Sequence, residues 1–79
     1  MGYHNREIEK GVIGEYSKIK EEFDELTDAV EQDNKVLILC ELTDLIGSIE
    51  EYSKKFNISL EDLIKMSNST KKAFKEGKR

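Results

Sequence analysis

The apolar residues in two segments of this chain recur at alternating intervals of four and three. The first segment carries them at Val12, Tyr16, Ile19, Phe23, Leu26 and Val30. The second segment carries them at Ile38, Leu42, Leu45, Ile49, Tyr52 and Phe56. Such spacing places each set on one side of an α-helix. We therefore predict helices over residues 13–32 and 35–56, joined by a short polar turn centred on Asp33.

A third helix is predicted over residues 59–76 from its capping residues. Ser59 is a favourable N-cap, and Asp62 stands three residues later, as in a capping box. Ile58 and Leu63 occupy the positions of a hydrophobic staple. The third helix therefore starts directly after the second, with no linker between them.

The composition favours one all-α domain over residues 1–79. The chain has no proline, and 38% of its residues are charged, a balance that favours helices over strands. Its length allows only a thin core, because small chains bury a low fraction of their surface. Gly11 and Gly14 interrupt the helical pattern, so residues 1–10 form either a short separate helix or an N-terminal arm.

The second predicted helix carries more apolar surface than one partner helix can cover. Close to the turn it adds Val36, Leu37, Leu39, Cys40 and Ile46 to its stripe. The most plausible cover for this excess is another copy of the chain. We expect the helical hairpin and the third helix to assemble into a four-helix-bundle-type homo-oligomer, either a dimer or a tetramer.

Charge and hydropathy exclude several classes of protein. Residues 1–64 carry 16 acidic and 7 basic side chains, which argues against nucleic-acid binding by the body of the chain. No apolar stretch approaches the roughly 18 residues of a membrane helix, and the first ten residues lack the apolar segment of a signal peptide. Cys40 is the only cysteine, which is typical of a reducing compartment. We expect a soluble cytoplasmic protein with no membrane or nucleic-acid partner.

Two pairs of acidic residues occupy matching positions on the first two helices. Glu22 and Glu25 stand three residues apart, and Glu41 and Asp44 repeat this spacing. Each pair projects from one face of its helix, beside the apolar seam. A turn centred on Asp33 makes the helices antiparallel neighbours, so residues at equal distances from it face each other. We predict that the four carboxylates gather at one level of the hairpin.

Four carboxylates this close repel each other unless protons or a cation compensate them. Oxygen ligands favour Mg²⁺, with Mn²⁺ as a substitute, over zinc or copper. Iron sites in helical bundles use a Glu-x-x-His motif, and the only histidine, His4, lies far from any such position. We therefore predict a Mg²⁺ site formed by Glu22, Glu25, Glu41 and Asp44. The alternative is that these acidic residues, which are numerous, simply cover solvated helix faces.

The segment Glu21-Glu22-Phe23-Asp24-Glu25, followed by Glu41-Leu42-Thr43-Asp44, resembles the E-x-x-E … E-x-x-D signature of MazG-like nucleoside triphosphate pyrophosphohydrolases. The similarity extends from about Gly11 to Arg79, and the chain looks like the compact single-domain versions carried by bacteriophages. The resemblance implies an enzyme that cleaves nucleoside or deoxynucleoside triphosphates between the α- and β-phosphates, releasing a monophosphate and pyrophosphate. It also implies that Glu22, Glu25, Glu41 and Asp44 bind Mg²⁺, and Glu22 or Glu25 is then the candidate catalytic base.

The resemblance extends to residues that would bind the substrate. Family members tend to carry Asn-x-x-Lys followed four residues later by a basic residue, and Asn68, Lys71 and Lys75 fit this pattern. Lys75 stands where arginine is commoner, and lysine cannot form arginine's bidentate contact. Lys18, one turn before Glu22, is a further candidate for holding phosphate. The alternative is that the lysines near the C-terminus complement the dipole of a solvated helix end.

A function of a different class stays open. The chain is also compatible with a non-catalytic helical adaptor that binds a partner protein through the wide apolar face of its second helix. That interpretation would explain the small size and the absence of an obvious base pocket. It predicts that neutralising Glu22 and Glu41 stabilises the fold and that Mg²⁺ does not raise the melting temperature.

Overall fold

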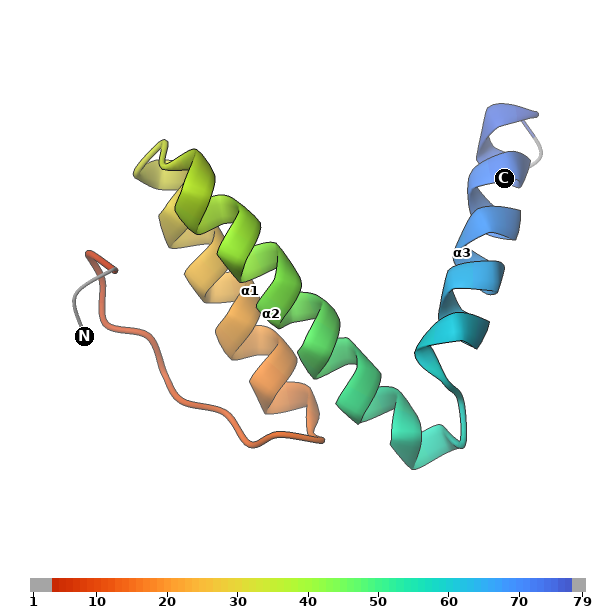
Figure 1. Ribbon diagram of the computed structural model, residues 1–79, viewed down its shortest axis with the longest axis horizontal. Coiled ribbons are helices and arrows are strands. Elements are labelled where there is room, and N and C mark those ends of the chain that lie inside the picture. Colours follow the sequence, from red (N-terminus) through yellow and green to blue (C-terminus); the bar gives the residue numbers. More distant parts are fainter. Residues whose placement is uncertain (1–3, 78–79) are drawn as a thin grey trace.

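The computed structural model describes residues 4–77, which form helices and no β-strand. The elements are α1 (Tyr16–Glu31), α2 (Lys35–Ser53), the short 3-10 helix η1 (Lys54–Phe56) and α3 (Leu60–Lys75). α1 and α2 lie side by side, and α3 stands apart from them in a molecule of 41 × 28 × 18 Å (Figure 1). The all-α prediction is therefore confirmed. Within residues 4–77, no helix has the length and apolar character needed to cross a membrane.

α1 begins at Tyr16 rather than at residue 13, because the chain turns just before it. The Glu15 amide donates to the Val12 carbonyl oxygen at 3.0 Å. Gly14 has a φ of 89°, a conformation that residues with a Cβ rarely adopt. Residues 4–10 are not helical and run beside α1 as an arm (Figure 1). The sequence left two alternatives for the N-terminal region, a short helix or an arm, and the described residues 4–10 form an arm.

The arm is held against the first turns of α1 by Gly11. A Cβ at this position would lie 2.2 Å from the carbonyl oxygen of Ser17, so no residue other than glycine fits without a shift of the backbone. The Gly11 amide donates to Glu21 Oε1 at 2.9 Å. The Val12 amide donates to Ser17 Oγ at 3.0 Å. These contacts fix the point at which the arm joins the hairpin.

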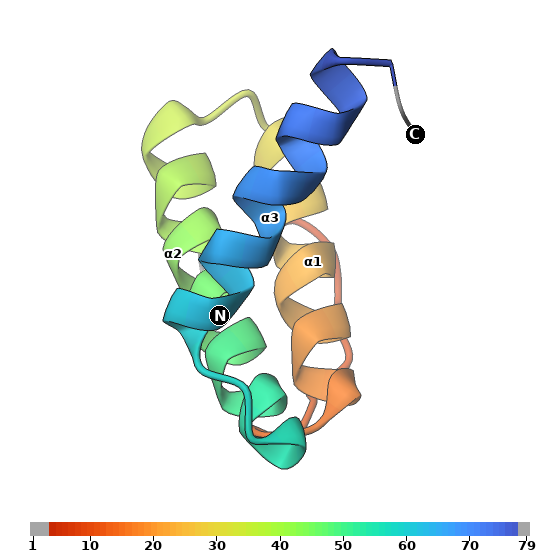
Figure 2. The ribbon, with the colours of Figure 1, turned by 90° about the vertical axis from the view of Figure 1, so that its right-hand side faces the viewer.

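The turn between α1 and α2 closes the hairpin at the predicted place. Asp33 adopts the left-handed conformation, with a φ of 54°. Its amide donates to the Val30 carbonyl oxygen, and the Asn34 amide donates to that of Ala29, which is the hydrogen-bond pattern of a Schellman motif. The Asn34 side chain then caps α2 by accepting from the Leu37 amide at 3.1 Å. The two helices therefore run antiparallel (Figure 2).

Most of the buried residues of the hairpin are polar. These buried residues, two of which form hydrogen bonds with the N-terminal arm, are called the inner face and consist of Glu21, Glu22, Asp28, Ala29, Leu37, Glu41, Ser48 and Ser53. The predicted apolar seams are only half-buried at Ile19, Leu26, Ile38, Leu45, Ile49 and Tyr52, and their other members are exposed. Tyr16, Phe23 and Val30 form an outer stripe on α1 and are each more than half exposed. A second outer stripe, on α2, consists of Val36, Leu39, Leu42 and Ile46.

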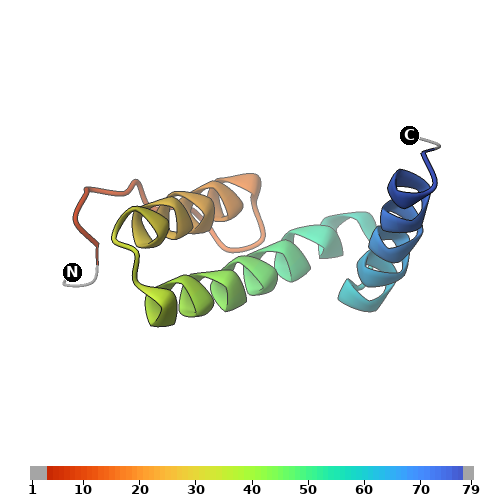
Figure 3. The same ribbon diagram turned by 90° about the horizontal axis from the view of Figure 1, so that it is seen from above.

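α3 begins with the capping box that the sequence predicts. The Asp62 amide donates to Ser59 Oγ at 3.1 Å, and the Ser59 amide donates to Asp62 Oδ2 at 3.4 Å. The helix starts at Leu60 and ends at Lys75, within one residue of the predicted range at either end. It leads away from the hairpin beyond the end of α2 (Figure 3). Among the described elements it contacts α2 but not α1.

Candidate metal centre

The structure brings Glu22 and Glu25 of α1 together with Glu41 and Asp44 of α2. One carboxylate oxygen from each residue lies within 4.8 Å of the other three. This follows from the helical geometry, because residues three apart share a face and the turn at Asp33 sets the two pairs at the same height. Glu22 and Glu41 are buried, Glu25 is half-buried and Asp44 is exposed. Glu22 and Glu41 therefore do not simply cover a solvated surface.

Two oxygens of this cluster are buried without a hydrogen-bond partner. They are Glu22 Oε1 and Glu41 Oε1, and each residue is only 5% exposed. A buried carboxylate oxygen that makes no hydrogen bond costs free energy comparable to a lost hydrogen bond or more. A cation would supply the missing partner. The donor set consists of hard oxygens, which suit Mg²⁺ or Mn²⁺, so the residues fit the predicted ion.

Burial and repulsion within the cluster change the pKa of Glu25. Burial, a hydrogen bond with Glu41 and the negative charges of Glu22 and Glu41 together raise its pKa to about 8. In the metal-free chain Glu25 therefore keeps a proton at neutral pH, which relieves the repulsion among the four carboxylates. A divalent cation that binds here has to displace that proton.

Lys18, a predicted substrate-binding residue, lies at the edge of the cluster. Its Nζ atom is 3.0 Å from Glu22 Oε2 and 3.1 Å from Glu21 Oε1. Burial opposes its charge, but hydrogen bonds to these two carboxylates raise its pKa on balance. Burial likewise opposes ionisation of Glu21, yet the Gly11 amide and Lys18 lower its pKa overall. Sequence reasoning missed Glu21, although its position one residue before Glu22 places it on the adjoining side of the same helix face.

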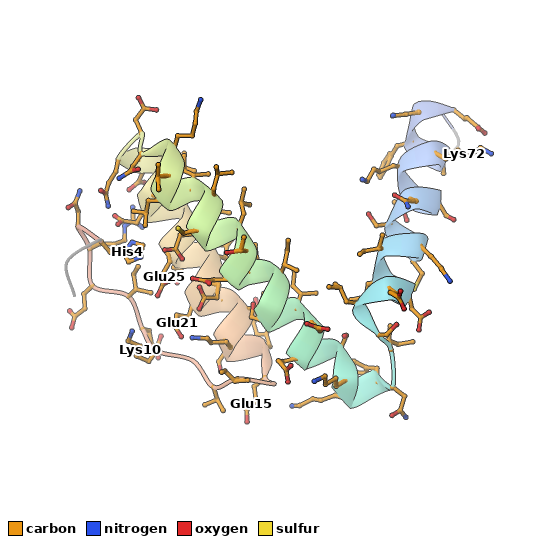
Figure 4. The ribbon with its side chains drawn as sticks, viewed as in Figure 1. His4, Lys10, Glu15, Glu21, Glu25 and Lys72 are labelled. Atoms are coloured by element: carbon orange, nitrogen blue, oxygen red, sulfur yellow. The ribbon has the colours of Figure 1, made fainter. Side chains whose placement is uncertain are left out.

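The arm brings His4, which belongs to no Glu-x-x-His motif, to the carboxylates. His4 Nε2 is 3.3 Å from Glu41 Oε2 and 3.7 Å from Glu25 Oε1. Its Nδ1 atom donates to Asp28 Oδ2 at 2.9 Å. Figure 4 shows His4 and Glu25 close together on the arm side of α1. Sequence reasoning did not predict this position, because distance along the sequence says nothing about a segment that folds back on a helix.

Asp28 is a second acidic residue that sequence reasoning missed. It is 2% exposed and also accepts from the Asn5 amide at 3.0 Å and from Gln32 Nε2 at 2.9 Å. Burial alone would raise its pKa, but these hydrogen bonds and the one from His4 lower it. The signal was available, because Asp28 stands three residues after Glu25 and so continues the spacing of Glu22 and Glu25.

The other three predicted substrate-binding residues, Asn68, Lys71 and Lys75, are not brought to the cluster within one chain. All three lie on α3 and are exposed. Lys72, their neighbour, lies toward the far end of α3, well away from His4 and Glu25 (Figure 4). The carboxylates that the structure groups together therefore come from the hairpin alone.

A groove beside the carboxylates offers room for a ligand. It has a volume of about 480 Å³ and is lined in part by Lys18, Glu22, Thr43, Asp44 and Ser48. This volume lies within the range of small-molecule sites, roughly 300–1,000 Å³. A second groove, of about 550 Å³, lies on the arm side and is bordered by His4, Glu25 and Glu41. The carboxylates thus stand between two open surfaces.

Taken together, fold and site define an all-α protein with a cluster of carboxylates between two antiparallel helices. The family model of phosphoribosyl-ATP pyrophosphohydrolase matches residues 2–71, so the chain belongs to this family. No curated protein and no solved structure matches it. The family is related to the all-α nucleoside triphosphate pyrophosphohydrolases that the motif suggested, but the match is not specifically to MazG-like enzymes. A function of the pyrophosphohydrolase type, and hence a hydrolase acting on acid anhydrides, is supported.

Proposed function

We propose that this chain is a Mg²⁺-dependent nucleotide pyrophosphohydrolase that releases a nucleoside monophosphate and pyrophosphate. The observation that carries the proposal is the pair of buried, unpartnered oxygens of Glu22 and Glu41 inside a ring of four carboxylates. A protein that needed only stability would not bury these groups unpaired. The family match supports the reaction class.

In this proposal Glu22, Glu25, Glu41 and Asp44 hold Mg²⁺, and Mn²⁺ can replace it. The bound ion would neutralise phosphate oxygens and lower the pKa of a water molecule. Glu25 is the stronger candidate for the catalytic base, because its pKa of about 8 in the metal-free chain is close to neutrality. Glu22 is the weaker candidate, because Lys18 already occupies its Oε2 atom. Lys18 also lines the groove beside Asp44, where it would contact a phosphate.

Two substrate classes follow from the site and its relatives. The motif favours nucleoside or deoxynucleoside triphosphates, and the matched family is named for phosphoribosyl-ATP. Both contain the same anhydride between the α- and β-phosphates, so the carboxylate centre serves either. The choice depends on how the base and sugar are bound, which is a matter of pocket shape rather than of the metal.

We further propose that the active enzyme is a homo-oligomer in which α3 completes the site of a neighbouring chain. The outer stripes of α1 and α2 leave large apolar side chains in solvent, which a second copy would cover. α3 extends away from its own hairpin (Figure 1), so its basic residues are free to approach another hairpin. Asn68, Lys71 and Lys75 would then bind phosphate groups there.

The first test is pyrophosphate release from a panel of nucleotides, including phosphoribosyl-ATP, with and without Mg²⁺. The variants Glu41→Gln and Asp44→Asn should lower turnover by at least about a hundredfold, since each removes a metal ligand. Asp24→Asn is the matched control, because Asp24 lies on the same helix as Glu25 but pairs with Lys20 at the surface. Wild-type activity in Glu41→Gln would overturn the site assignment.

The exposed stripe of α2 also favours the second function, a helical adaptor. The two proposals differ in what they require of the carboxylates. An adaptor has no use for Mg²⁺, so an adaptor without a metal centre should show the same melting temperature with and without the ion. A rise in melting temperature with Mg²⁺ that Glu41→Gln abolishes would favour the enzyme.

A further inference from the structure

The N-terminal arm places a nitrogen ligand at a centre that otherwise contains only oxygen. We propose that His4 coordinates the metal together with Glu25 and Glu41, so that the centre binds Mn²⁺ more tightly than Mg²⁺. The inference rests on the proposed function, because it concerns the same metal centre. It goes beyond that function by assigning a ligand outside the E-x-x-E and E-x-x-D motifs and by assigning metal selectivity to the arm.

The distances around His4 Nε2 are slightly longer than those between neighbouring ligands on one ion. Nε2 lies 3.3 Å from Glu41 Oε2 and 3.7 Å from Glu25 Oε1. Two adjacent ligands of an octahedral ion, each about 2.1 to 2.2 Å from it, stand about 3 Å apart. The three residues each offer an atom within 4.8 Å of the others. Small side-chain movements would therefore place all three atoms on one ion.

Asp28 orients the ring for this role. Because His4 Nδ1 donates to Asp28 Oδ2 at 2.9 Å, the neutral ring has its lone pair on Nε2, the atom that faces Glu25 and Glu41. Histidines that bind metals commonly donate their other ring nitrogen to a carboxylate in this way. Asp28 is almost fully buried and also accepts from the Asn5 amide. The backbone next to His4 is thus held by the same carboxylate as its ring.

Glu41 provides the independent sign that a cation belongs here. Its Oε2 atom faces His4, but its Oε1 atom is buried and has no hydrogen-bond partner. If His4 served only to balance the charge of Glu41, that second oxygen would remain unsatisfied. A cation bound by His4, Glu25 and both carboxylate oxygens of Glu41 would satisfy it.

The arm is anchored firmly enough to keep His4 at the centre. Arg6 pairs with Glu31, and Lys10 Nζ lies 3.6 Å from Glu21 Oε2. Gly11 then joins the arm to α1 at a point where only glycine fits. A nitrogen ligand held in this way favours Mn²⁺ over Mg²⁺, because imidazole suits transition metals and Mg²⁺ prefers oxygen.

The decisive experiment is pulsed electron paramagnetic resonance of Mn²⁺ bound to the full, untagged chain. The chain contains a single histidine, so labelling histidine with ¹⁵N reports on one residue. We expect a nitrogen coupling from a directly bound atom, with the isotope change altering its frequency. The coupling should vanish in His4→Gln.

Binding measurements by calorimetry give the second readout. His4→Gln should weaken Mn²⁺ binding by about 10–100-fold and Mg²⁺ binding by less than about threefold. Asp28→Asn, which leaves the metal ligands in place, should weaken Mn²⁺ binding by less than His4→Gln does. The control Asp24→Asn should match the wild type for both ions, because Asp24 lies outside the cluster.

The outcomes separate this inference from the proposed function. Mn²⁺ that binds without a nitrogen coupling, and equally well in His4→Gln, would overturn the assignment of His4 and leave the carboxylate centre intact. Tighter binding in His4→Gln would also overturn it, since His4 would then compete with the metal. If the wild type binds neither ion, both the assignment and the proposed function fail.

Discussion

The inner face and the outer stripes of the hairpin differ in a way that runs against the usual arrangement of a small protein. The inner face buries Glu22, Glu41 and Asp28, whereas Phe23 and Val30 on the outer stripe of α1 are more than half exposed. Burying apolar side chains is what ordinarily stabilises a fold. The hairpin instead buries several carboxylates more completely than most of its apolar side chains. In our proposal the inner face serves metal binding, and the outer stripes carry apolar area available for packing.

The largest effect is expected where the outer stripes are made polar. The double variant Leu39→Glu/Ile46→Glu puts two charges on the outer stripe of α2, where the proposed assembly would bury them. We expect the dissociation constant to rise by at least about a hundredfold, close to 3 kcal/mol, because an unpaired charge would be desolvated. Light scattering after size-exclusion chromatography measures it. Ser69→Glu, an exposed position on α3, is the charge control. A wild type that is monomeric at all concentrations would refute the prediction.

The inner face should respond in the opposite sense when its charge is removed. In Glu22→Gln/Glu41→Gln the repulsion with Glu25 is relieved, so the metal-free chain should become more stable by about 1–2 kcal/mol. The same variant should lose stabilisation by Mg²⁺, which for the wild type reaches about 2.7 kcal/mol at a hundred times the dissociation constant. Urea unfolding with and without Mg²⁺ gives both values. A variant less stable than the metal-free wild type would show that the carboxylates support the fold.

The pKa of Glu25 makes metal binding at the inner face depend on pH. With a folded pKa of about 8, Glu25 has to lose its proton when the ion binds. Mg²⁺ affinity should therefore rise with pH, by up to about tenfold per unit below pH 8, and level off above it. Calorimetry in two buffers with different heats of ionisation counts the released proton. Glu25→Gln should remove the release.

The raised pKa of Glu25 also makes the stability of the metal-free fold depend on pH. Stability falls as pH rises, whereas metal affinity increases. The folded pKa lies above the ordinary value of 4.5, so the native chain binds more protons than the unfolded chain between about pH 4.5 and 8. The contribution of Glu25 to stability is therefore fully present below this range and declines as pH rises through it. Unfolding experiments without metal should show this decline in the wild type and lose it in Glu25→Gln.

The smallest effect is expected at the turn, where a substitution can lower the stability of the fold without changing the charge of the inner face. Asn34→Ala removes the N-cap of α2 without touching the inner face. It should cost about 1 kcal/mol of unfolding free energy and leave Mg²⁺ affinity unchanged. A parallel loss of affinity would indicate that the height at which Glu25 meets Glu41 depends on the cap.

Local signals explain which parts of this molecule the sequence predicts. The spacing of apolar residues predicts two helices, the polar stretch at Asp33 predicts their turn, and Ser59 with Asp62 predicts the start of α3. Equal distances from the turn predict that Glu25 meets Glu41. All of these depend on residues that are close in sequence, or on the symmetry of a hairpin.

The remainder depends on contacts that periodicity does not encode. A stripe of apolar residues indicates a helix, but it does not say which neighbour covers the stripe. Here Leu26 is half-buried, whereas Phe23 and Val30 in the same stripe stay exposed. The position of His4 results from an arm that folds back through contacts with Asp28 and Gly11. No local signal predicts that α3, which carries Asn68 and Lys71, leads away from the hairpin. The residues of α3 do not encode which surface the helix contacts.

The fit at Gly11 has a genetic consequence. Glycine codons change their meaning with any substitution at their first or second base, and every replacement adds the Cβ that would meet the Ser17 carbonyl oxygen at 2.2 Å. A single point mutation there would force the arm or the first turn of α1 to shift, although it would change none of the four carboxylates. If His4 binds the metal as we propose, natural variation at this codon would remove the nitrogen ligand, and ion preference would depend on a single codon of this scaffold.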